Sequence, residues 1–194
     1  KGERLEIFKH KPAPLQISYL GYFGTLGMQE IDYLIADPCT IPDSEDQFYT
    51  EKIYKFKDYS YHSSLYAIPE HSAQPPCITN GYVTLGSLNT FHKISGTVLN
   101  TWIAILKQVP DSKLLFDSRS MISVTDQEFF IDLFIRSGIA KERLIFRATV
   151  DREKFLQGYN EIDIALDPFP YTGATTTTES LLMGVPLVTL FGNK

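Results

Sequence analysis

Residues 166–184, LDPFPYTGATTTTESLLMG, contain the side chains whose types and spacing most clearly could do chemistry. Thr176 and Glu179 have the T-x-x-E spacing of a capping box, which predicts a helix beginning near Thr177. Gly184 is expected to end this helix. Backbone N–H groups at a helix start, surrounded by hydroxyls, favour an anion such as a phosphate. A well-capped structural helix without a ligand is the alternative interpretation.

A second polar loop has the sequence GSLNTFHK over residues 86–93 and lies between an expected strand and an expected helix. Its small residues allow close backbone approach, Asn89 offers a donor and an acceptor, and Lys93 offers a mobile positive charge. The loop is neither a Walker A motif nor a dinucleotide GxGxxG. A lysine near a helix start that binds a diphosphate could stabilise a departing nucleotide. We therefore take Lys93 as the candidate catalytic residue, and His92 as structural or surface.

Short apolar strands alternate with helices from residue 81 onward, which indicates a parallel, doubly wound α/β sheet of the Rossmann type. Ligands of such sheets bind beyond the carboxyl ends of the strands, where loops 86–93, 147–152 and 167–178 are expected to lie. The expected strands cover residues 82–85, 113–116, 143–146, 162–166 and 187–190, and the expected helices residues 95–109, 126–137 and 151–159, besides the one near Thr177.

The first 80 residues are less regular. Residues 15–20 read as a strand, followed by a glycine-punctuated turn, a short helix over residues 28–36 and a strand over residues 53–56. Residues 57–80 contain three prolines and an Asn-Gly pair without periodicity, which is typical of a linker.

Composition excludes several classes of protein. The 194 residues are 43% hydrophobic and 21% charged, as expected of a chain with a packed core. A net charge of −5 without a basic patch argues against nucleic acid as a partner. No apolar run approaches the roughly 18 residues of a membrane span. Cys39 and Cys77 lack metal-ligand spacing and indicate reduced thiols in a cytoplasmic protein. A start at Lys1 and an end directly after an expected strand suggest a piece of a longer protein.

Four motifs in order resemble one family. They are LGYFGT at residues 20–25, residues 81–93 with N-x-x-x-K, DIALDPFPYTGATTTTE at residues 163–179, and MGVPLVTL at residues 183–190. Together they resemble the catalytic region of the O-linked N-acetylglucosamine transferases, glycosyltransferase family 41, especially its bacterial members. The resemblance covers the chain from about residue 12 to its end.

The resemblance implies a GT-B architecture, in which two Rossmann-like domains enclose the active site. Residues 1–76 would be the end of the N-terminal catalytic domain, and residues 77–194 most of the nucleotide-sugar-binding domain. Tetratricopeptide repeats would lie upstream. The implied reaction transfers N-acetylglucosamine from UDP-N-acetylglucosamine to Ser or Thr hydroxyls of proteins with inversion, without a metal or other cofactor.

The resemblance also implies roles for individual residues. Lys93 would contact the UDP diphosphate, Thr175 and Thr176 would present the diphosphate-binding helix start, and Glu179 would bind the ribose hydroxyls. The loop that borders the uracil would consist of Val150, Asp151 and Arg152. Other residues expected at the UDP-sugar are Asn89, Thr90, Phe155, Gly173 and Ala174, whereas Gly21, Gly24 and Thr25 would face the sugar and the acceptor.

Several positions depart from the family pattern. Phe23 replaces a proline of the glycine turn, Thr90 replaces a glutamine, and Phe155 and Ala174 replace histidines found in animal enzymes. The histidine candidates for activating the acceptor would lie upstream of Lys1, so no general base is expected among His10, His62, His71 and His92, which we interpret as structural or surface residues. Three alternatives stay open: a related transferase that attaches a hexose to Asn, a non-catalytic UDP-sugar-binding or scaffold homologue, and a structural piece without a ligand.

Overall fold

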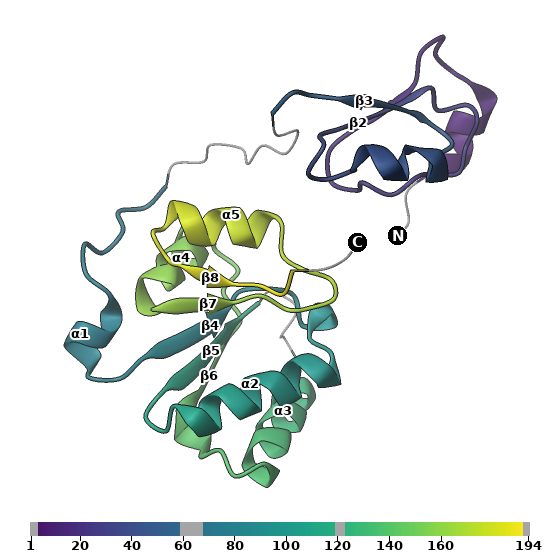
Figure 1. Ribbon diagram of the computed structural model, residues 1–194. Helices are drawn as coiled ribbons and strands as arrows, with labels where there is room; N and C mark the ends of the chain where they lie inside the picture. Colours follow the sequence, from purple (N-terminus) through teal and green to yellow (C-terminus); the bar gives the residue numbers. More distant parts are fainter. Residues whose placement is uncertain (1–3, 59–67, 119–122, 192–194) are drawn as a thin grey trace. The chain divides into compact units, whose positions relative to one another are not determined.

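The chain forms two compact units, Lys1–Ser64 and Leu65–Lys194 (Figure 1). A computed structural model describes residues 4–58, 68–118 and 123–191. The division lies upstream of the predicted boundary at residues 76 and 77, and the assignment of the two units to two catalytic domains stays a prediction. In the part of the chain that the structure describes, no helix is long and apolar enough to cross a membrane.

The second unit contains a five-stranded parallel sheet with the order β6-β5-β4-β7-β8. Its strands are β4 (Thr84–Ser87), β5 (Lys113–Asp117), β6 (Leu144–Arg147), β7 (Ile164–Leu166) and β8 (Leu187–Val188). The chain first builds outward from β4 to β6 and then returns to the other side of β4 to begin β7. This reversal places a topological switch point between β4 and β7. The predicted parallel, doubly wound sheet is confirmed.

Helices cover both faces of this sheet (Figure 1). Helices α2 (Gly96–Gln108) and α3 (Val124–Arg136) pack on one face, and α4 (Arg152–Gln157) and α5 (Thr175–Leu182) on the other. The alternation of side chains along a strand supplies both cores, because Leu114 and Phe116 of β5 point to one face and Leu115 to the other. Short 3-10 segments complete the unit: η3 (Phe91–Lys93), η4 (Lys141–Arg143) and η5 (Gly158–Glu161).

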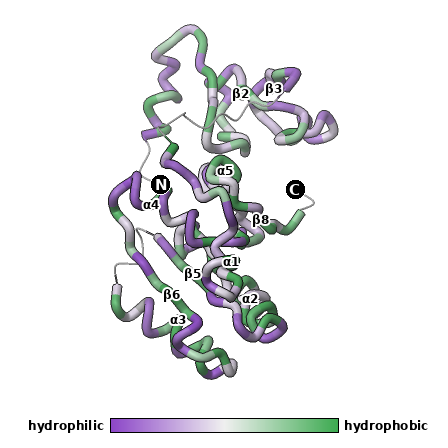
Figure 2. Tube along the Cα trace, turned by 90° about the vertical axis from the view of Figure 1, so that its left-hand side faces the viewer, coloured by the Kyte–Doolittle hydropathy of each residue, from purple (hydrophilic) through white to green (hydrophobic). Residues whose placement is uncertain are grey.

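Helix α2 shows why the regular part of the chain was predictable. Ser95 is its N-cap, and the Ser95 hydroxyl accepts a hydrogen bond from the N–H of Val98. Val98, Trp102 and Leu106 are buried at helical spacing, and much of the helix trace is hydrophobic (Figure 2). At the carboxyl end, the Arg143 guanidinium donates to the carbonyls of Leu106 and of Val109 and Ser112. The predicted bounds of 95–109 agree with the helix within one residue at each end.

The first unit holds a small parallel sheet, in the order β1-β2-β3. Its strands are β1 (Ile17–Ser18), β2 (Tyr33–Ala36) and β3 (Lys52–Lys55), and two 3-10 segments, η1 (Leu5–His10) and η2 (Asp43–Phe48), flank them. The strand predicted at residues 53–56 is confirmed with a shift of one residue, and the one predicted at residues 15–20 shortens to two residues.

The helix predicted over residues 28–36 is wrong, because half of that segment is β2. Strand pairing on both sides decides its conformation: Leu34 pairs with Ser18 of β1 and with Ile53 of β3. The Asp32 carboxylate also accepts from the N–H of Gln16, which fixes the chain just before the strand. Tertiary partners of this kind override local helical periodicity.

The predicted linker at residues 57–80 includes a structured segment. Its residues 59–67 lie outside the described ranges, but residues 68–80 belong to the second unit and include α1 (Pro76–Asn80). The Asn160 side chain accepts from the N–H of Ser72 and donates to the carbonyl of Glu70. The Asp163 carboxylate accepts from the N–H groups of Cys77 and Thr84.

Phe116 is a central residue of the core that lies between the sheet and helices α2 and α3. Its ring is fully buried, stacks on Phe146 at 4.9 Å between centroids, and contacts Trp102, Phe130 and Phe134. We predict that Phe116→Ala lowers the free energy of unfolding by about 3–5 kcal/mol because it leaves a cavity among these rings. Urea unfolding followed by circular dichroism measures the effect. The control is Phe129→Ala, which removes a 64% exposed ring from α3 and should cost about 0.5 kcal/mol or less. Equal losses in both variants would contradict this packing.

Candidate functional site

Three loops converge on the carboxyl edge of the five-stranded sheet, as predicted. They follow β4, β6 and β7, which all run parallel. The loops after β4 and β7 flank the switch point, where an open α/β sheet forms its crevice. Lys93 lies at the end of the first of these loops, and Gly173 to Thr176 lie at the end of the second.

Lys93 reaches from its own loop to the loop after β7. Its Nζ donates to the carbonyl oxygen of Thr172 at 2.9 Å and approaches the Oδ1 of Asn89 at 3.5 Å. The same Nζ lies 4.6 Å from the ring centroid of Tyr171, within the range of a cation–π contact. Burial lowers the pKa of Lys93, and the carboxylate of Asp167 opposes this shift. The ammonium is therefore held directly beside the start of α5 by partners that the sequence did not identify.

Asn89 connects the two loops through its side-chain amide. The Nδ2 donates to the Oδ1 of Asp167 at 3.4 Å, and the Oδ1 accepts from the hydroxyl of Thr176 at 3.1 Å. Asn89 is buried, and both ends of its amide have partners within the protein. This geometry supports a role in which Asn89 places Lys93 and Thr176, whereas direct contact with a ligand was expected from the sequence.

Asp167 is a member of the site that sequence reasoning missed. Its Oδ1 accepts from the N–H of Gly173 at 2.7 Å, and its Oδ2 accepts from the hydroxyl of Thr189 at 2.8 Å. The carboxylate is buried, directly after β7. A signal was present in the sequence, because an aspartate that follows a strand at the switch point has its carboxylate among the loops that form the crevice.

Helix α5 begins two residues earlier than predicted, and its predicted capping box is wrong. Ala174 is the N-cap, and its methyl side chain has no oxygen that could accept from the first turn. The two residues expected to form the box have other partners, since the Thr176 hydroxyl donates to Asn89 and Glu179 pairs with Arg152. A helix start without a capping side chain leaves its first N–H groups to be satisfied by another acceptor.

The end of α5 agrees with the prediction. Gly184 has a φ of +74°, in the left-handed region that favours glycine. The N–H of Val185 donates to the carbonyl of Ser180, and the N–H of Gly184 donates to that of Leu181. These two bonds form a Schellman motif, which holds α5 firmly at its carboxyl end.

Glu179 of α5 forms an ion pair with Arg152, the first residue of α4. The Arg152 guanidinium lies 2.5 Å from Oε1 of Glu179, whose residue is only 3% exposed. The other oxygen, Oε2, is buried and lacks a hydrogen-bond partner in the described part of the chain. The carboxylate expected at the ribose therefore has an internal cation as its partner in this structure.

Tyr159 packs beside this ion pair and supports the start of α5. Its hydroxyl donates to the carbonyl oxygen of Thr176 at 3.0 Å. Burial raises the pKa of Tyr159 far above its usual value, and the nearby Glu179 carboxylate adds to the shift. The phenol thus stays protonated and acts as a donor.

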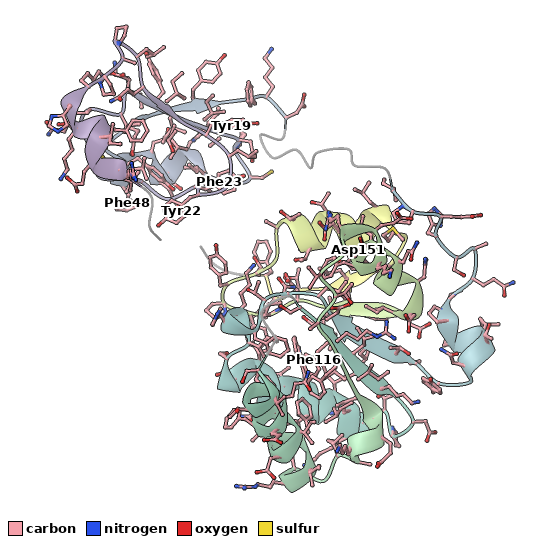
Figure 3. The ribbon with its side chains drawn as sticks, turned by 180° about the vertical axis from the view of Figure 1, so that it is seen from behind. Tyr19, Tyr22, Phe23, Phe48, Phe116 and Asp151 are labelled. Carbon is pink, nitrogen blue, oxygen red and sulfur yellow. The ribbon has the colours of Figure 1, made fainter. Side chains whose placement is uncertain are left out.

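The residues expected near the uracil lie on the loop after β6 and the first turn of α4. Val150 is exposed, and Asp151 is the N-cap of α4, with its carboxylate accepting from the N–H of Lys154 (Figure 3). Phe155 packs its ring edge-on against Tyr159, with the Arg152 guanidinium 6.0 Å from its ring centroid. Thr90, expected at the same ligand, is exposed at the N-cap of η3.

The glycine turn of the first unit has its own internal support. Gly21 has a φ of +105°, so the turn requires a glycine there, whereas a Cβ on Gly24 would meet only the outer ring atoms of the exposed Tyr22 side chain, 2.8 Å away. The Thr25 hydroxyl and the N–H of Leu26 both donate to the buried carboxylate of Glu51. Figure 3 labels the aromatic residues of this turn, Tyr22 and Phe23.

The sequence profile of Glycosyl transferase family 41 matches residues 1–74 and 67–194. The chain belongs to glycosyltransferase family 41. The predicted resemblance is thereby confirmed over the whole chain.

Curated relatives in family 41 agree with this assignment. The chain is 36% identical over 197 residues to the Petunia hybrida protein named probable UDP-N-acetylglucosamine–peptide N-acetylglucosaminyltransferase SPINDLY, and 30% identical over 208 residues to the Arabidopsis thaliana protein of that enzyme name called SEC. These alignments cover 99% and 98% of this chain, but only 21% and 20% of the relatives. The chain thus spans about a fifth of the length of the curated relatives it matches.

Solved structures confirm the expected α/β fold of GT-B type. A mutant of Thermobaculum terrenum O-GlcNAc transferase is 31% identical and matches with a TM-score of 0.86 over 98% of this chain and 36% of that chain. A mutant of S. aureus TarM, in complex with fondaparinux, alpha-GlcNAc-glycerol and UDP, matches with a TM-score of 0.56 at 12% identity, over 81% of this chain and 29% of that one. The second likeness concerns the fold alone.

The ion pair between Arg152 and Glu179 joins a buried carboxylate to a partly exposed guanidinium. We predict that Arg152→Met lowers the free energy of unfolding by about 1–2 kcal/mol, because it leaves the Glu179 carboxylate buried without its cation and Arg152 itself is partly exposed. Adding Glu179→Gln to this variant should recover part of the loss, since a neutral amide is cheaper to bury. Chemical denaturation of the four proteins of this double-mutant cycle measures the coupling.

The matched control for this cycle is Arg136→Met. Arg136 also forms a 2.5 Å ion pair, with Asp132, but both side chains are more than half exposed. Its loss should cost about 0.5 kcal/mol or less. If Arg152→Met lost no more free energy of unfolding than Arg136→Met, the pair of Arg152 and Glu179 would contribute no more stability than an exposed ion pair.

Proposed function

We propose that the protein containing this chain is an inverting glycosyltransferase that moves N-acetylglucosamine from UDP-N-acetylglucosamine to Ser or Thr hydroxyls of proteins. The observation that carries the proposal is the convergence of Lys93 with the start of α5 across the switch point. The names of the family 41 relatives, which describe transfer from UDP-N-acetylglucosamine to peptides, supply the donor and the acceptor class.

The diphosphate of the donor is proposed to lie between Lys93 and the first turn of α5, at Thr175 and Thr176. A lysine ammonium and the N–H groups of a helix start are both donors, and together they would balance the negative charge of two phosphates. Charge stabilisation by fixed donors is usually the largest catalytic contribution, so this pair would also stabilise the departing UDP. We therefore propose a reaction that needs neither a metal nor another cofactor.

The nucleoside is proposed to lie beside the first turn of α4. Val150 and Asp151 would border the uracil, Phe155 would offer an aromatic surface, and Glu179 would accept from the ribose hydroxyls. Because Glu179 pairs with Arg152 in this structure, ribose binding would require Arg152 to share or release the carboxylate. The turn at Gly21, Gly24 and Thr25 is proposed to face the sugar and the acceptor.

The proposed chemistry is a single displacement. The acceptor oxygen attacks the anomeric carbon from the face opposite UDP, a C–O bond to the acceptor forms, and the C–O bond to the diphosphate breaks. UDP leaves with the bonding electrons, and the hydroxyl proton passes to a base that we place upstream of Lys1 in the full-length protein. Holding the reactants in line would lower the entropic part of the barrier.

The partners and location follow from the same proposal. The acceptor is a protein or peptide, and tetratricopeptide repeats upstream would present it; nucleic acid has no role. Both cysteines are free thiols, and Cys39 is exposed, which supports a reducing compartment such as the cytoplasm.

The proposal is tested by incubating the full-length protein with nucleotide sugars and Ser/Thr peptides, and by detecting the product by mass spectrometry. We expect transfer of N-acetylglucosamine to a hydroxyl from the UDP donor. Transfer of a hexose to Asn would contradict the proposed acceptor and sugar. Binding of UDP in calorimetry without transfer to any peptide would contradict catalysis and identify a scaffold homologue.

Lys93→Ala provides the residue-level test of catalysis. We predict that this variant lowers kcat for transfer by about 10²–10³, because a donor to the charge that develops on the diphosphate is lost. Thermal unfolding should change much less than transfer does, since Lys93 is only partly buried. The matched control is Lys113→Ala at the opposite edge of the sheet, where the ammonium lies 4.2 Å from the ring centroid of Tyr82. Unchanged transfer by Lys93→Ala would exclude it as the catalytic residue.

The pH dependence of UDP binding gives a further prediction. The pKa of Lys93 lies below its usual value in the free protein, and a bound diphosphate favours the charged form. UDP affinity should therefore be steady at lower pH and fall as pH rises through this depressed pKa, earlier than for an ordinary lysine. Calorimetry across alkaline pH measures the fall. Lys93→Met should bind more weakly at neutral pH and lack this fall, and an identical profile in both proteins would contradict the assignment.

A further inference from the structure

Two aspartates flank strand β7, and each accepts hydrogen bonds at its own end of the strand. Asp163, before the strand, accepts from the N–H groups of Cys77 and Thr84 and so holds α1 and β4 at the amino edge. Asp167, after the strand, accepts from the N–H of Gly173, the amide of Asn89 and the hydroxyl of Thr189 at the carboxyl edge. Both residues are carboxylate acceptors, but Asp163 binds groups at the amino edge of the sheet and Asp167 binds groups at the carboxyl edge.

The partners of Asp167 belong to both loops at the switch point. Gly173 precedes α5, whereas Asn89 lies on the loop that carries Lys93. Asn89 in turn contacts Lys93 and Thr176 through its Oδ1, so these two residues are each two hydrogen bonds from the Asp167 carboxylate. A displacement of this carboxylate would move both loops together.

A carboxylate fits this position for a specific reason. An ionised carboxylate accepts only, so the amide of Asn89 must turn its NH₂ toward Asp167 and its oxygen toward Thr176 and Lys93. The fit is also tight, because a Cβ on Gly173 would lie 2.9 Å from the Asp167 Oδ1 and 2.6 Å from the Thr176 hydroxyl. Asp167 is itself buried, and the donors around it balance its charge.

We propose that Asp167 is a positioning residue, which holds the Gly173 turn and the Asn89–Lys93 loop in the one arrangement that binds the donor diphosphate. This inference rests on the proposed function of the site. It assigns to Asp167 no contact with the ligand and no step of the chemistry. Its action is through the hydrogen bonds that it accepts.

Two substitutions separate hydrogen-bond geometry from charge. Asp167→Asn removes the charge but keeps an oxygen for Gly173 and Asn89, and its NH₂ can donate to the Thr189 hydroxyl. Asp167→Glu keeps the charge but moves the carboxylate by one methylene. In the full-length protein, we expect Asp167→Asn to bind UDP within about threefold of wild type, and Asp167→Glu to bind about tenfold or more weakly, the size of one charge-assisted hydrogen bond. Calorimetry with UDP measures both affinities.

Asp163→Glu is the matched control, because it makes the same change in an aspartate that holds backbone at the other edge. We expect it to lower the unfolding temperature as Asp167→Glu does, but to leave UDP affinity within about twofold of wild type. A purely structural role for Asp167 would give the same result at both positions. Should Asp167→Glu fail to fold, Gly173→Ala displaces the same turn while Asp167 stays intact, and it too should weaken UDP binding about tenfold or more.

The outcomes distinguish this inference from the function on which it rests. A wild-type protein that does not bind UDP overturns the proposed function. A wild type that binds UDP, with Asp167→Glu equal to it or tighter, overturns the positioning role. Stronger weakening by Asp167→Asn than by Asp167→Glu also overturns it, because the charge, which only the glutamate variant keeps, would then matter more than the arrangement of hydrogen bonds.

Discussion

The arrangement of this molecule depends on the reversal of strand order between β4 and β7. Parallel strands deliver all their following loops to one edge, and the reversal brings the loop after β4 beside the loop after β7, where hydrogen bonds join them. Lys93 follows one strand, and the start of α5 follows the other. A proposed anion site arises here because residues nearly 80 positions apart in the chain end adjacent strands.

Buried carboxylates stabilise the loops in both units. Asp167 holds the turn before α5, Glu51 holds the glycine turn of the first unit, and Asp117 accepts from the N–H of Thr149 on the loop after β6. In each case an ionised acceptor replaces the backbone ladder that a loop lacks, and charge-assisted bonds of this kind are stronger than neutral ones. The loops are thereby ordered without regular secondary structure.

The sequence predicted the second unit well because each level of pattern agreed with the others. Apolar strands, the bounds of α2 and Gly184 after α5 were all found where local patterns placed them. The first unit was harder, since Tyr33–Ala36 becomes a strand only through its neighbours β1 and β3. Its periodicity could not reveal partners so distant in the chain.

The sequence predicted most residues of the candidate site, but it did not predict the hydrogen bonds and ion pairs between them. The loop position of Lys93 and the threonine-rich helix start follow from the motifs, whereas the capping box failed because Thr176 and Glu179 had competing partners in other segments. Asp167 was missed for a similar reason, as its three donors come from three separate segments, after β4, β7 and β8. Long-range hydrogen bonds of this type leave no spacing signature.

The ion pair of buried Glu179 and partly exposed Arg152 has a consequence for the selectivity of such a site. A ligand hydroxyl that takes over this carboxylate would exchange one partner for another, so the net gain at that position is a small difference between two large interactions. A group that fails to replace the guanidinium well would gain nothing there. Binding at this position would thus depend on how well each nucleoside replaces the Arg152 guanidinium as the partner of Glu179. The pair would therefore increase discrimination among nucleosides more than it increases affinity.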